Sequence, residues 1–153
     1  MITVDDDDER GGYLVRATGK MPRGMAAADV VRLHMDPEAA GVFRDVGKYE
    51  SFECSENGNV CVASWKVGKM TIAVRKRAVG NGAINFESTA DSHVRTEGSW
   101  TVDDEEDTIS IRQTIAPPVP SWLPRALVRR VIRGKFRNVY DDINKTSFFK
   151  SIT

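Results

Sequence analysis

The sequence has few of the residues that build metal sites and disulfide frameworks. Its 153 residues include two histidines, His34 and His93, and two cysteines, Cys54 and Cys61. No spacing among these four resembles a zinc site, and no pattern in the sequence assembles four ligands. We therefore expect no metal ion and no other cofactor.

Other absences exclude further classes of protein. The formal net charge is zero, from 22 basic and 22 acidic residues, so overall charge does not indicate a nucleic-acid partner. No apolar run approaches the roughly 18 residues of a membrane-spanning helix. No Gly-rich loop leads into a helix, as phosphate binding would require, and no Gly-x-Ser-x-Gly nucleophile motif occurs. Catalytic residues are therefore not assigned.

The start of the chain has no signal-peptide pattern. Met1 to Val4 lead directly into the acidic run Asp5 to Glu9, whereas a secretory signal has a basic and then an apolar region. We expect an intracellular protein, cytoplasmic or organellar, from which a transit peptide could have been removed. Hydrophobic residues make up 41% of the chain, which is ordinary for a soluble globular protein.

The order of predicted elements indicates the architecture. One strand over 13–21 is followed by two short helical segments, 25–35 and one that begins after Asp36. About six strands with alternating apolar residues then cover about 47–115. Among them are 70–79, with Met70, Ile72 and Val74 on one side, and 83–88. A long helix from about Pro124 to about Ser147 ends the pattern. We expect an α+β fold in which an antiparallel sheet curves around this helix, because neither can bury its apolar face alone. Residues 1–11 are expected to form an acidic flexible segment and 12–149 a single domain.

The strongest local signal is a hairpin centred on Asn57-Gly58, a pair that favours a two-residue type I′ turn. This turn places Cys54 opposite Cys61 and Phe52 opposite Ala63. The two cysteines are then close enough to form a disulfide. Because there is no secretion signal, we favour free thiols as small apolar residues of a buried face. On a later strand, Gly98 indicates a bend or bulge.

The last helix is amphipathic. Its predicted buried arc contains Val128, Val131, Ile132, Phe136, Val139 and Ile143. Lys135 lies within or beside this arc, where it either extends to the rim or reaches a ligand's polar group. Four arginines on the opposite side, with Trp122 in the proline-rich loop before the helix, suggest a membrane or partner surface: Arg129, Arg130, Arg133 and Arg137. A solvated helix face is the simpler explanation.

At this level the chain resembles the START-like, or polyketide cyclase-like (SRPBCC), superfamily. The resemblance is carried by Ala28 to Glu38 with its Asp-Pro-Glu, by Phe43, by Glu97-Gly98-Ser99-Trp100 and by the terminal helix. It implies the helix-grip fold, with a seven-stranded antiparallel sheet around the C-terminal helix and a hydrophobic pocket between them. Members mostly bind lipids, sterols or other apolar small molecules, and some are enzymes. The superfamily has no universal functional residue to transfer.

The predicted pocket residues are those expected on the inner side of sheet and helix: Phe43, Phe52, Trp65, Phe86, Trp100, Ile111, Gln113, Ile132, Lys135 and Phe136. The aromatic ones could equally fill a core. We expect a monomer that binds, and could transport, an apolar small molecule or lipid. One alternative is a cyclase or isomerase, for which Gln113, Glu50, Lys135 and His93 are the candidate polar residues. Another is a module without a ligand that contacts a membrane or protein through its basic helix face.

Overall fold

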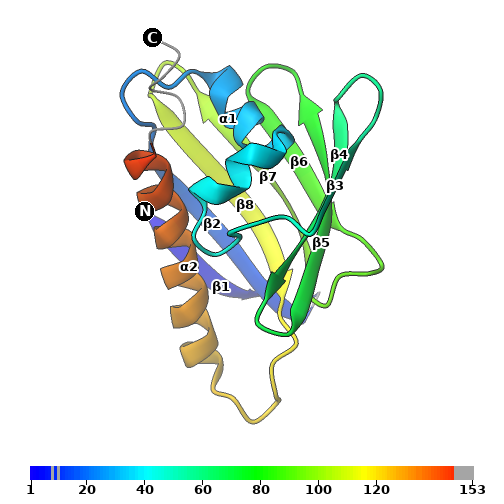
Figure 1. Cartoon of the computed structure of the whole chain (residues 1–153). Helices are drawn as coiled ribbons and strands as arrows, with labels where there is room; N and C mark the ends of the chain where they lie inside the picture. The colour runs from blue at the N-terminus through cyan, green and yellow to red at the C-terminus, as the bar shows by residue number, and fades with distance from the viewer. Residues whose placement is uncertain (8, 10, 147–153) are drawn as a thin grey trace.

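An eight-stranded antiparallel sheet, with helices on one face, makes up the structure (Figure 1), which is a computed structural model describing residues 1–7, 9 and 11–146. The strand order is β1-β2-β8-β7-β6-β5-β4-β3. The elements are β1 Ile2–Asp7, β2 Gly12–Lys20, α1 Ala27–Met35, η1 Pro37–Val42, β3 Ser51–Cys54, β4 Val60–Val67, β5 Met70–Val79, β6 Ala83–Ser88, β7 Arg95–Asp103, β8 Thr108–Ala116 and α2 Arg125–Lys145.

This is the predicted α+β helix-grip architecture with one additional strand. Residues Ile2–Asp7, which we expected to be flexible, form the edge strand β1 and pair with β2. The physical reason is the alternation at the start of the chain, which turns Val4 into the core, where it is 4% exposed. The acidic run therefore begins inside a strand. The last predicted domain residues, 147–149, lie outside the described residues.

The strand pairing follows the apolar alternation of the sequence. One transverse row crosses all eight strands in the order Val4, Val15, Gln113, Gly98, Phe86, Lys76, Cys61 and Cys54. Residues of one row project from the same face because side chains alternate along every strand. This row belongs to the inner face, so it places Lys76 among apolar neighbours.

Two local predictions need correction. The hairpin has the predicted register, with Cys54 opposite Cys61, but its turn is not type I′. That turn needs positive φ at both central residues, and here Gly58 has a φ of 72° while Asn57 does not have a positive φ. Gly98 forms no bulge, because its pairing with β6 and β8 is continuous. It permits close strand approach instead, since a Cβ there would clash with the Arg112 carbonyl.

The helices before the hairpin cover one end of the inner face. Val30 and Leu33 of α1 are buried, and Phe43 follows η1 into the core. The Asp36 carboxylate accepts a hydrogen bond from the Glu38 backbone N–H over 2.9 Å, which caps η1 as the sequence predicts. The Asp-Pro-Glu segment therefore fixes where α1 stops and η1 begins.

Helix α2 packs mainly against β1 and β2, the edge of the sheet that carries the extra strand. Val128, Ile132, Phe136 and Ile143 are buried as predicted, whereas Val131 is 53% exposed and does not belong to the buried arc. Tyr140 fits over Gly19, where a Cβ would clash with its ring, and its hydroxyl donates to the Ile109 carbonyl over 2.9 Å. Burial raises the pKa of this hydroxyl.

Candidate functional site

A cavity of about 200 Å³ lies between the sheet and the segments that cover its inner face. Strands β4 to β8 contribute one wall, and α1, the segment after η1 and the C-terminal half of α2 contribute the other. Its lining is predominantly apolar and includes residues from the sheet and from the covering segments: His34, Phe43, Asp45, Val46, Tyr49, Trp65, Ile72, Val74, Lys76, Phe86, Val94, Thr96, Trp100, Gln113, Ile115, Val139 and Asp142.

Half of the predicted pocket residues belong to the lining of this cavity. Phe43, Trp65, Phe86, Trp100 and Gln113 line the cavity. The Trp100 ring stands edge-on to Phe43, with 6.1 Å between ring centroids. The structure thus brings together aromatic residues from three strands and from the segment after η1.

The other predicted residues lie elsewhere. Ile111, Ile132 and Phe136 are at most 8% exposed and belong to the buried core, outside the cavity lining. Because α2 packs mainly against β1 and β2, only its later residues, Val139 and Asp142, reach the cavity. Phe52 is half-buried and packs on Tyr49, with 5.0 Å between ring centroids.

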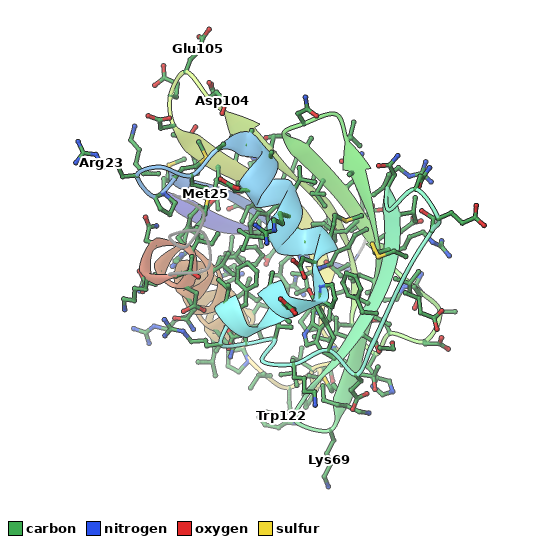
Figure 2. All side chains as sticks on the ribbon, turned by 45° about the horizontal axis from the view of Figure 1, so that its top comes forward. Arg23, Met25, Lys69, Asp104, Glu105 and Trp122 are labelled. Carbon is green, nitrogen blue, oxygen red and sulfur yellow. A yellow bond between two sulfur atoms is a disulfide. The ribbon has the colours of Figure 1, made fainter. Side chains whose placement is uncertain are left out.

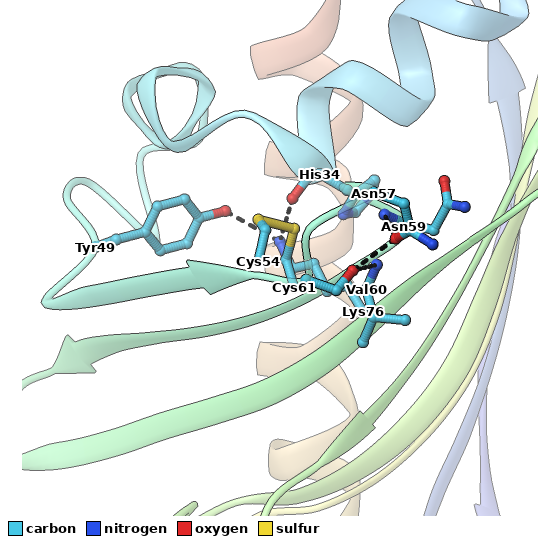
Figure 3. The surroundings of a disulfide bond; sticks show 9 residues. His34, Tyr49, Cys54, Asn57, Asn59, Val60, Cys61 and Lys76 are labelled. Atoms are coloured by element: carbon cyan, nitrogen blue, oxygen red, sulfur yellow. Dashed lines mark hydrogen bonds between the residues drawn. A yellow bond between two sulfur atoms is a disulfide. The ribbon is translucent and has the colours of Figure 1, made fainter.

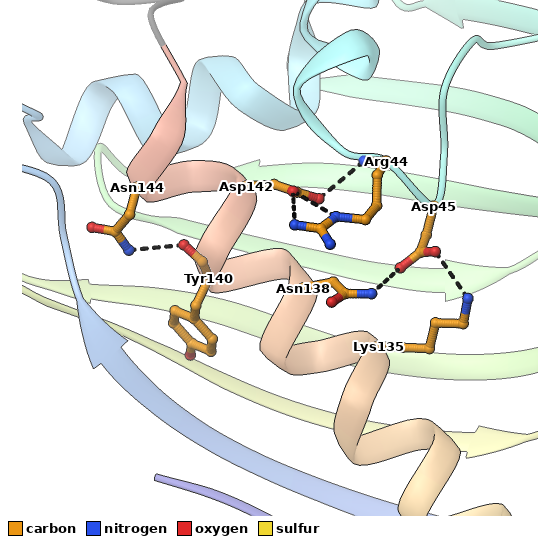
Figure 4. Close-up of polar contacts among 7 residues, drawn as sticks. All are labelled: Arg44, Asp45, Lys135, Asn138, Tyr140, Asp142 and Asn144. Atoms are coloured by element: carbon orange, nitrogen blue, oxygen red, sulfur yellow. Dashed lines mark hydrogen bonds and ion pairs between the residues drawn. The ribbon is translucent and has the colours of Figure 1, made fainter.

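Lys135 is exposed and lies outside the cavity wall. Its ammonium group pairs with the Asp45 carboxylate over 2.9 Å, so it bridges α2 to the segment after η1. Nearby, Arg44 pairs with Asp142 over 2.7 Å. Figure 4 shows both contacts, which hold the segment that carries Arg44 and Asp45 against α2. These pairs fix one side of the cavity.

The main polar group of the cavity is Lys76, which we did not predict. Its side chain projects from β5 into the inner face and is 7% exposed. Nζ donates to the Tyr49 hydroxyl over 3.0 Å and to the His34 carbonyl over 3.4 Å, as Figure 3 shows. Burial lowers the pKa of Lys76 to about 7 and raises that of Tyr49 to about 12.

His34 is the second unpredicted polar residue. It is 7% exposed, and its ring lies edge-on to Trp100 with 4.3 Å between centroids. Nε2 is buried without a hydrogen-bond partner. Burial, and then the neighbouring Lys76 charge, hold the pKa of His34 well below its ordinary value. The ring is therefore neutral and can offer one N–H.

Of the four candidate polar residues from the sequence, one lines the cavity and three do not. Gln113 lines the cavity, and its amide donates to Thr96 Oγ1 over 2.7 Å. Glu50, Lys135 and His93 are exposed and are not in the wall. His93 Nδ1 accepts a hydrogen bond from the Thr71 backbone over 2.7 Å at the surface.

A signal for Lys76 was present in the sequence. The predicted strand 70–79 turns Met70, Ile72 and Val74 to one side, and the same alternation places Lys76 with them. A charged residue at an inner position is uncommon and points to a functional group. No comparable signal marked His34, whose burial depends on how α1 lies over Trp100.

The structure contains a Cys54–Cys61 disulfide, so the expectation of free thiols is wrong. The opposed positions in the hairpin brought the two sulfur atoms together, as the register allowed. Cys61 is fully buried and flanks Lys76 in the sheet. The disulfide therefore holds the strand next to the cavity lysine to the edge strand β3.

The basic face of α2 is only partly as predicted. Arg130, Arg133 and Arg137 are exposed. Arg129 is half-buried and pairs with Asp6 of β1 over 2.7 Å, which lowers the pKa of that carboxyl. Trp122 is 78% exposed and lies at the end of the molecule opposite Asp104 and Glu105 (Figure 2). Among the described residues, no helix is long and apolar enough to cross a membrane.

A larger depression of about 850 Å³ lies on the outer face of the sheet. Exposed polar groups of both signs line it, among them Arg75 and Glu87, which pair with each other over 3.6 Å. It holds no buried polar side chain, so the inner cavity is the stronger candidate site. Within residues 1–7, 9 and 11–146, no cluster of three or more His, Cys, Asp or Glu could hold a metal ion.

Known structures share this fold. The chain is similar to a STAR-related lipid transfer protein of Xanthomonas axonopodis (TM-score 0.62, 16% identity, 94% of this chain and 96% of that one). It is also similar to the Zhui aromatase/cyclase of a Streptomyces strain (0.60, 13%, 86% and 90%) and to a START superfamily protein of Mycobacterium smegmatis (0.60, 11%, 93% and 100%). No family model and no curated protein matches the sequence. The chain has a START-like, polyketide cyclase-like fold.

Proposed function

We propose that this protein binds an apolar small molecule in the inner cavity and carries it without chemical change. The observation that carries the proposal is the cavity itself, an apolar space of about 200 Å³ lined by aromatic rings and left unfilled by side chains. Protein interiors are otherwise close-packed, so a space of this size among apolar residues indicates a ligand site. The lipid-transfer protein among the similar structures supports the same function.

A matched pair of variants on α2 tests this proposal. Val139 lines the cavity, whereas Val131, two turns earlier on the same helix, is exposed. Val139→Phe should fill part of the cavity and weaken binding of octanol, measured by titration of tryptophan fluorescence, about tenfold or more. Val131→Phe should leave it unchanged. Equal affinities for both variants, or no octanol binding by the unaltered protein, would contradict the proposal.

Catalysis of the cyclase or isomerase kind is a second candidate, and Lys76 is the observation that favours it. An amine with a pKa of about 7 can take up and release protons at neutral pH. The test is exchange of the α-protons of cyclohexanone in D₂O, followed by NMR. A catalyst should accelerate the exchange, and Lys76→Met should abolish the acceleration. An exchange rate no faster than in buffer alone argues against this function.

Membrane contact is a proposal about a different surface. Four apolar side chains are exposed around the start of α2: Val119, Trp122, Leu127 and Val131. Arg130 and Arg133 lie on the same helix. An apolar tip beside basic residues fits a surface that touches an anionic membrane while a ligand is loaded or released.

Liposome flotation tests the membrane contact. Binding should need anionic lipid, fall at high salt because exposed charges are screened, and weaken when Arg130, Arg133 and Arg137 are changed to Gln. Trp122→Ser should weaken it at all salt concentrations. Binding that is unaffected by the arginine substitutions and by Trp122→Ser would exclude this surface.

A further inference from the structure

We propose that the ligand of the inner cavity is a small apolar acid, whose carboxylate pairs with the ammonium group of Lys76. This inference rests on the proposed binding function and adds the chemical class of the ligand. It is drawn from the polar groups of the cavity, which include a cation but no anion left to neutralise it.

Lys76 has only neutral partners. An ammonium group carries three N–H donors, and the protein supplies two acceptors, the Tyr49 hydroxyl and the His34 carbonyl. The Tyr49 and Trp65 rings lie 5.2 and 6.0 Å from Nζ and favour the cation weakly. Within the described part of the chain, no carboxylate lies within ion-pair distance of Nζ. One N–H therefore remains for a ligand.

The carboxylates that do line the cavity are already paired. Asp45 contacts Lys135 over 2.9 Å, and Asp142 contacts Arg44 over 2.7 Å and the Arg44 backbone N–H over 3.0 Å. Both are engaged at the side of the cavity next to α2. Because burying an unpaired charge is unfavourable, an anion that enters the cavity gains an interaction that the protein itself does not supply.

His34 gives a second, independent indication of a polar ligand group. Its ring lines the same cavity, and Nε2 is buried with no partner. Buried polar atoms are nearly always hydrogen-bonded, so an unpaired one marks a place for a missing group. In the tautomer with a proton on Nε2, His34 is a donor. A carboxylate offers two oxygens, so it can accept from Lys76 and from His34.

The size of the cavity limits the apolar part. About 200 Å³ has room for about seven groups the size of a water molecule, at ~30 Å³ each. One ring with a short side chain, or an alkyl chain of about seven carbons beyond the carboxylate, fits this volume. A two-chain lipid does not. Octanoate is therefore a suitable probe, with octanol and octylamine as partners of the same length.

The acid should bind with proton uptake at mildly alkaline pH. The titratable groups that line the cavity with Lys76 are His34 from α1, Tyr49 and Asp45 from the segment after η1, and Asp142 from α2. Burial keeps His34 and Tyr49 neutral near pH 8, and both aspartates are paired. Lys76, with a pKa of about 7, is then the group that must gain a proton when a carboxylate arrives.

The experiment is calorimetry of the three probes at pH 8 in two buffers of different ionisation enthalpy. Octanoate should bind at least tenfold more tightly than octanol, as expected for a charge-assisted hydrogen bond, and should take up protons, whereas octanol should not. Lys76→Met should remove both differences. Lys76→Arg should retain tight octanoate binding, and Lys66→Met, which alters an exposed lysine on β4, should change nothing.

The outcomes separate this inference from the proposed function. If octanol and octanoate bind equally and without proton uptake, the acid specificity is wrong while the apolar site remains. If no probe binds, both are wrong. The proton measurement needs no variant, so it decides the question even if Lys76→Met does not fold.

Discussion

Arg44 and Asp142 join the segment after η1 to the last helix: the guanidinium lies 2.7 Å from one carboxylate oxygen, and the Arg44 backbone N–H donates to the other over 3.0 Å. The hydrogen bond to Asp142 raises the pKa of Arg44. Residues 98 apart in sequence thus meet beside the cavity.

The first prediction separates the two parts of this contact. Asp142→Ala should lower the free energy of unfolding by about 0.5–1.5 kcal/mol, because it removes the hydrogen bond from the Arg44 backbone N–H. Arg44→Ala should cost less, since the backbone contact survives and the guanidinium is exposed. Urea unfolding of the two variants measures the difference. Equal losses would show that the backbone hydrogen bond contributes nothing.

The second prediction concerns the stability cost of Lys76. Its pKa falls from an ordinary 10.5 to about 7 on folding, so between these values the unfolded chain binds more protons. Stability should therefore rise with pH across this window. Lys76→Met removes the penalty and should raise the free energy of unfolding at pH 7 by about 1–4 kcal/mol. The gain over the unaltered protein should shrink toward pH 10.

Urea unfolding at pH 7 and pH 9.5 checks both parts. Lys66→Met is the control and should follow the unaltered protein at both values. A Lys76→Met variant that is less stable at pH 7, or whose advantage does not change with pH, would mean that Lys76 is not a buried, unpaired amine.

The third prediction concerns the hairpin. The purified protein should have an intact mass about 2 Da below that of the dithiol form, the mass of two hydrogens lost on oxidation. The disulfide closes a short loop, with a separation of 7 residues, so its loss in Cys54→Ser should cost about 2 kcal/mol. Reduction should give the same change in unfolding. An unchanged mass and unchanged stability would argue for free thiols.

The fourth prediction distinguishes core from cavity. Phe136 is 8% exposed and packed in the core, so Phe136→Ala should cost about 3–5 kcal/mol. Val131→Ala on the exposed side should cost less than about 0.5 kcal/mol. Thermal unfolding of both variants provides the comparison. A loss below about 1 kcal/mol for Phe136→Ala would indicate that this ring borders open space.

The sequence predicted the strands better than it predicted the site. Strict alternation located Met70–Val79 and Ala83–Ser88 with the observed bounds, because a half-buried strand has a period of two that few other structures share. The same reasoning failed for β1, because its alternation consists of Ile2 and Val4 alone and the acidic run follows directly. Helix α2 packs mainly against β1 and β2, so Ile132 and Phe136 are core residues rather than cavity residues.

The site residues were missed for a related reason. Apolar patterns identify which residues face the inside of the protein. They do not show which of these residues contact each other and which of them border a cavity. Lys76 follows the alternation of its strand, so its inner position could have been predicted from the sequence. His34 was not, since its contact with Trp100 depends on the angle of α1. Likewise, Val131 lies about 100° around the helix from Ile132, outside the arc of the buried residues, and it is exposed.

The most direct test of the account is a crystal structure of the protein with octanoate. The account predicts the ligand in the inner cavity, with its carboxylate in hydrogen-bond contact with Lys76 Nζ and its chain against Phe86 and Val139. A carboxylate turned to solvent, or octanoate found on the outer face of the sheet beside Arg75 with the inner cavity empty, would contradict it.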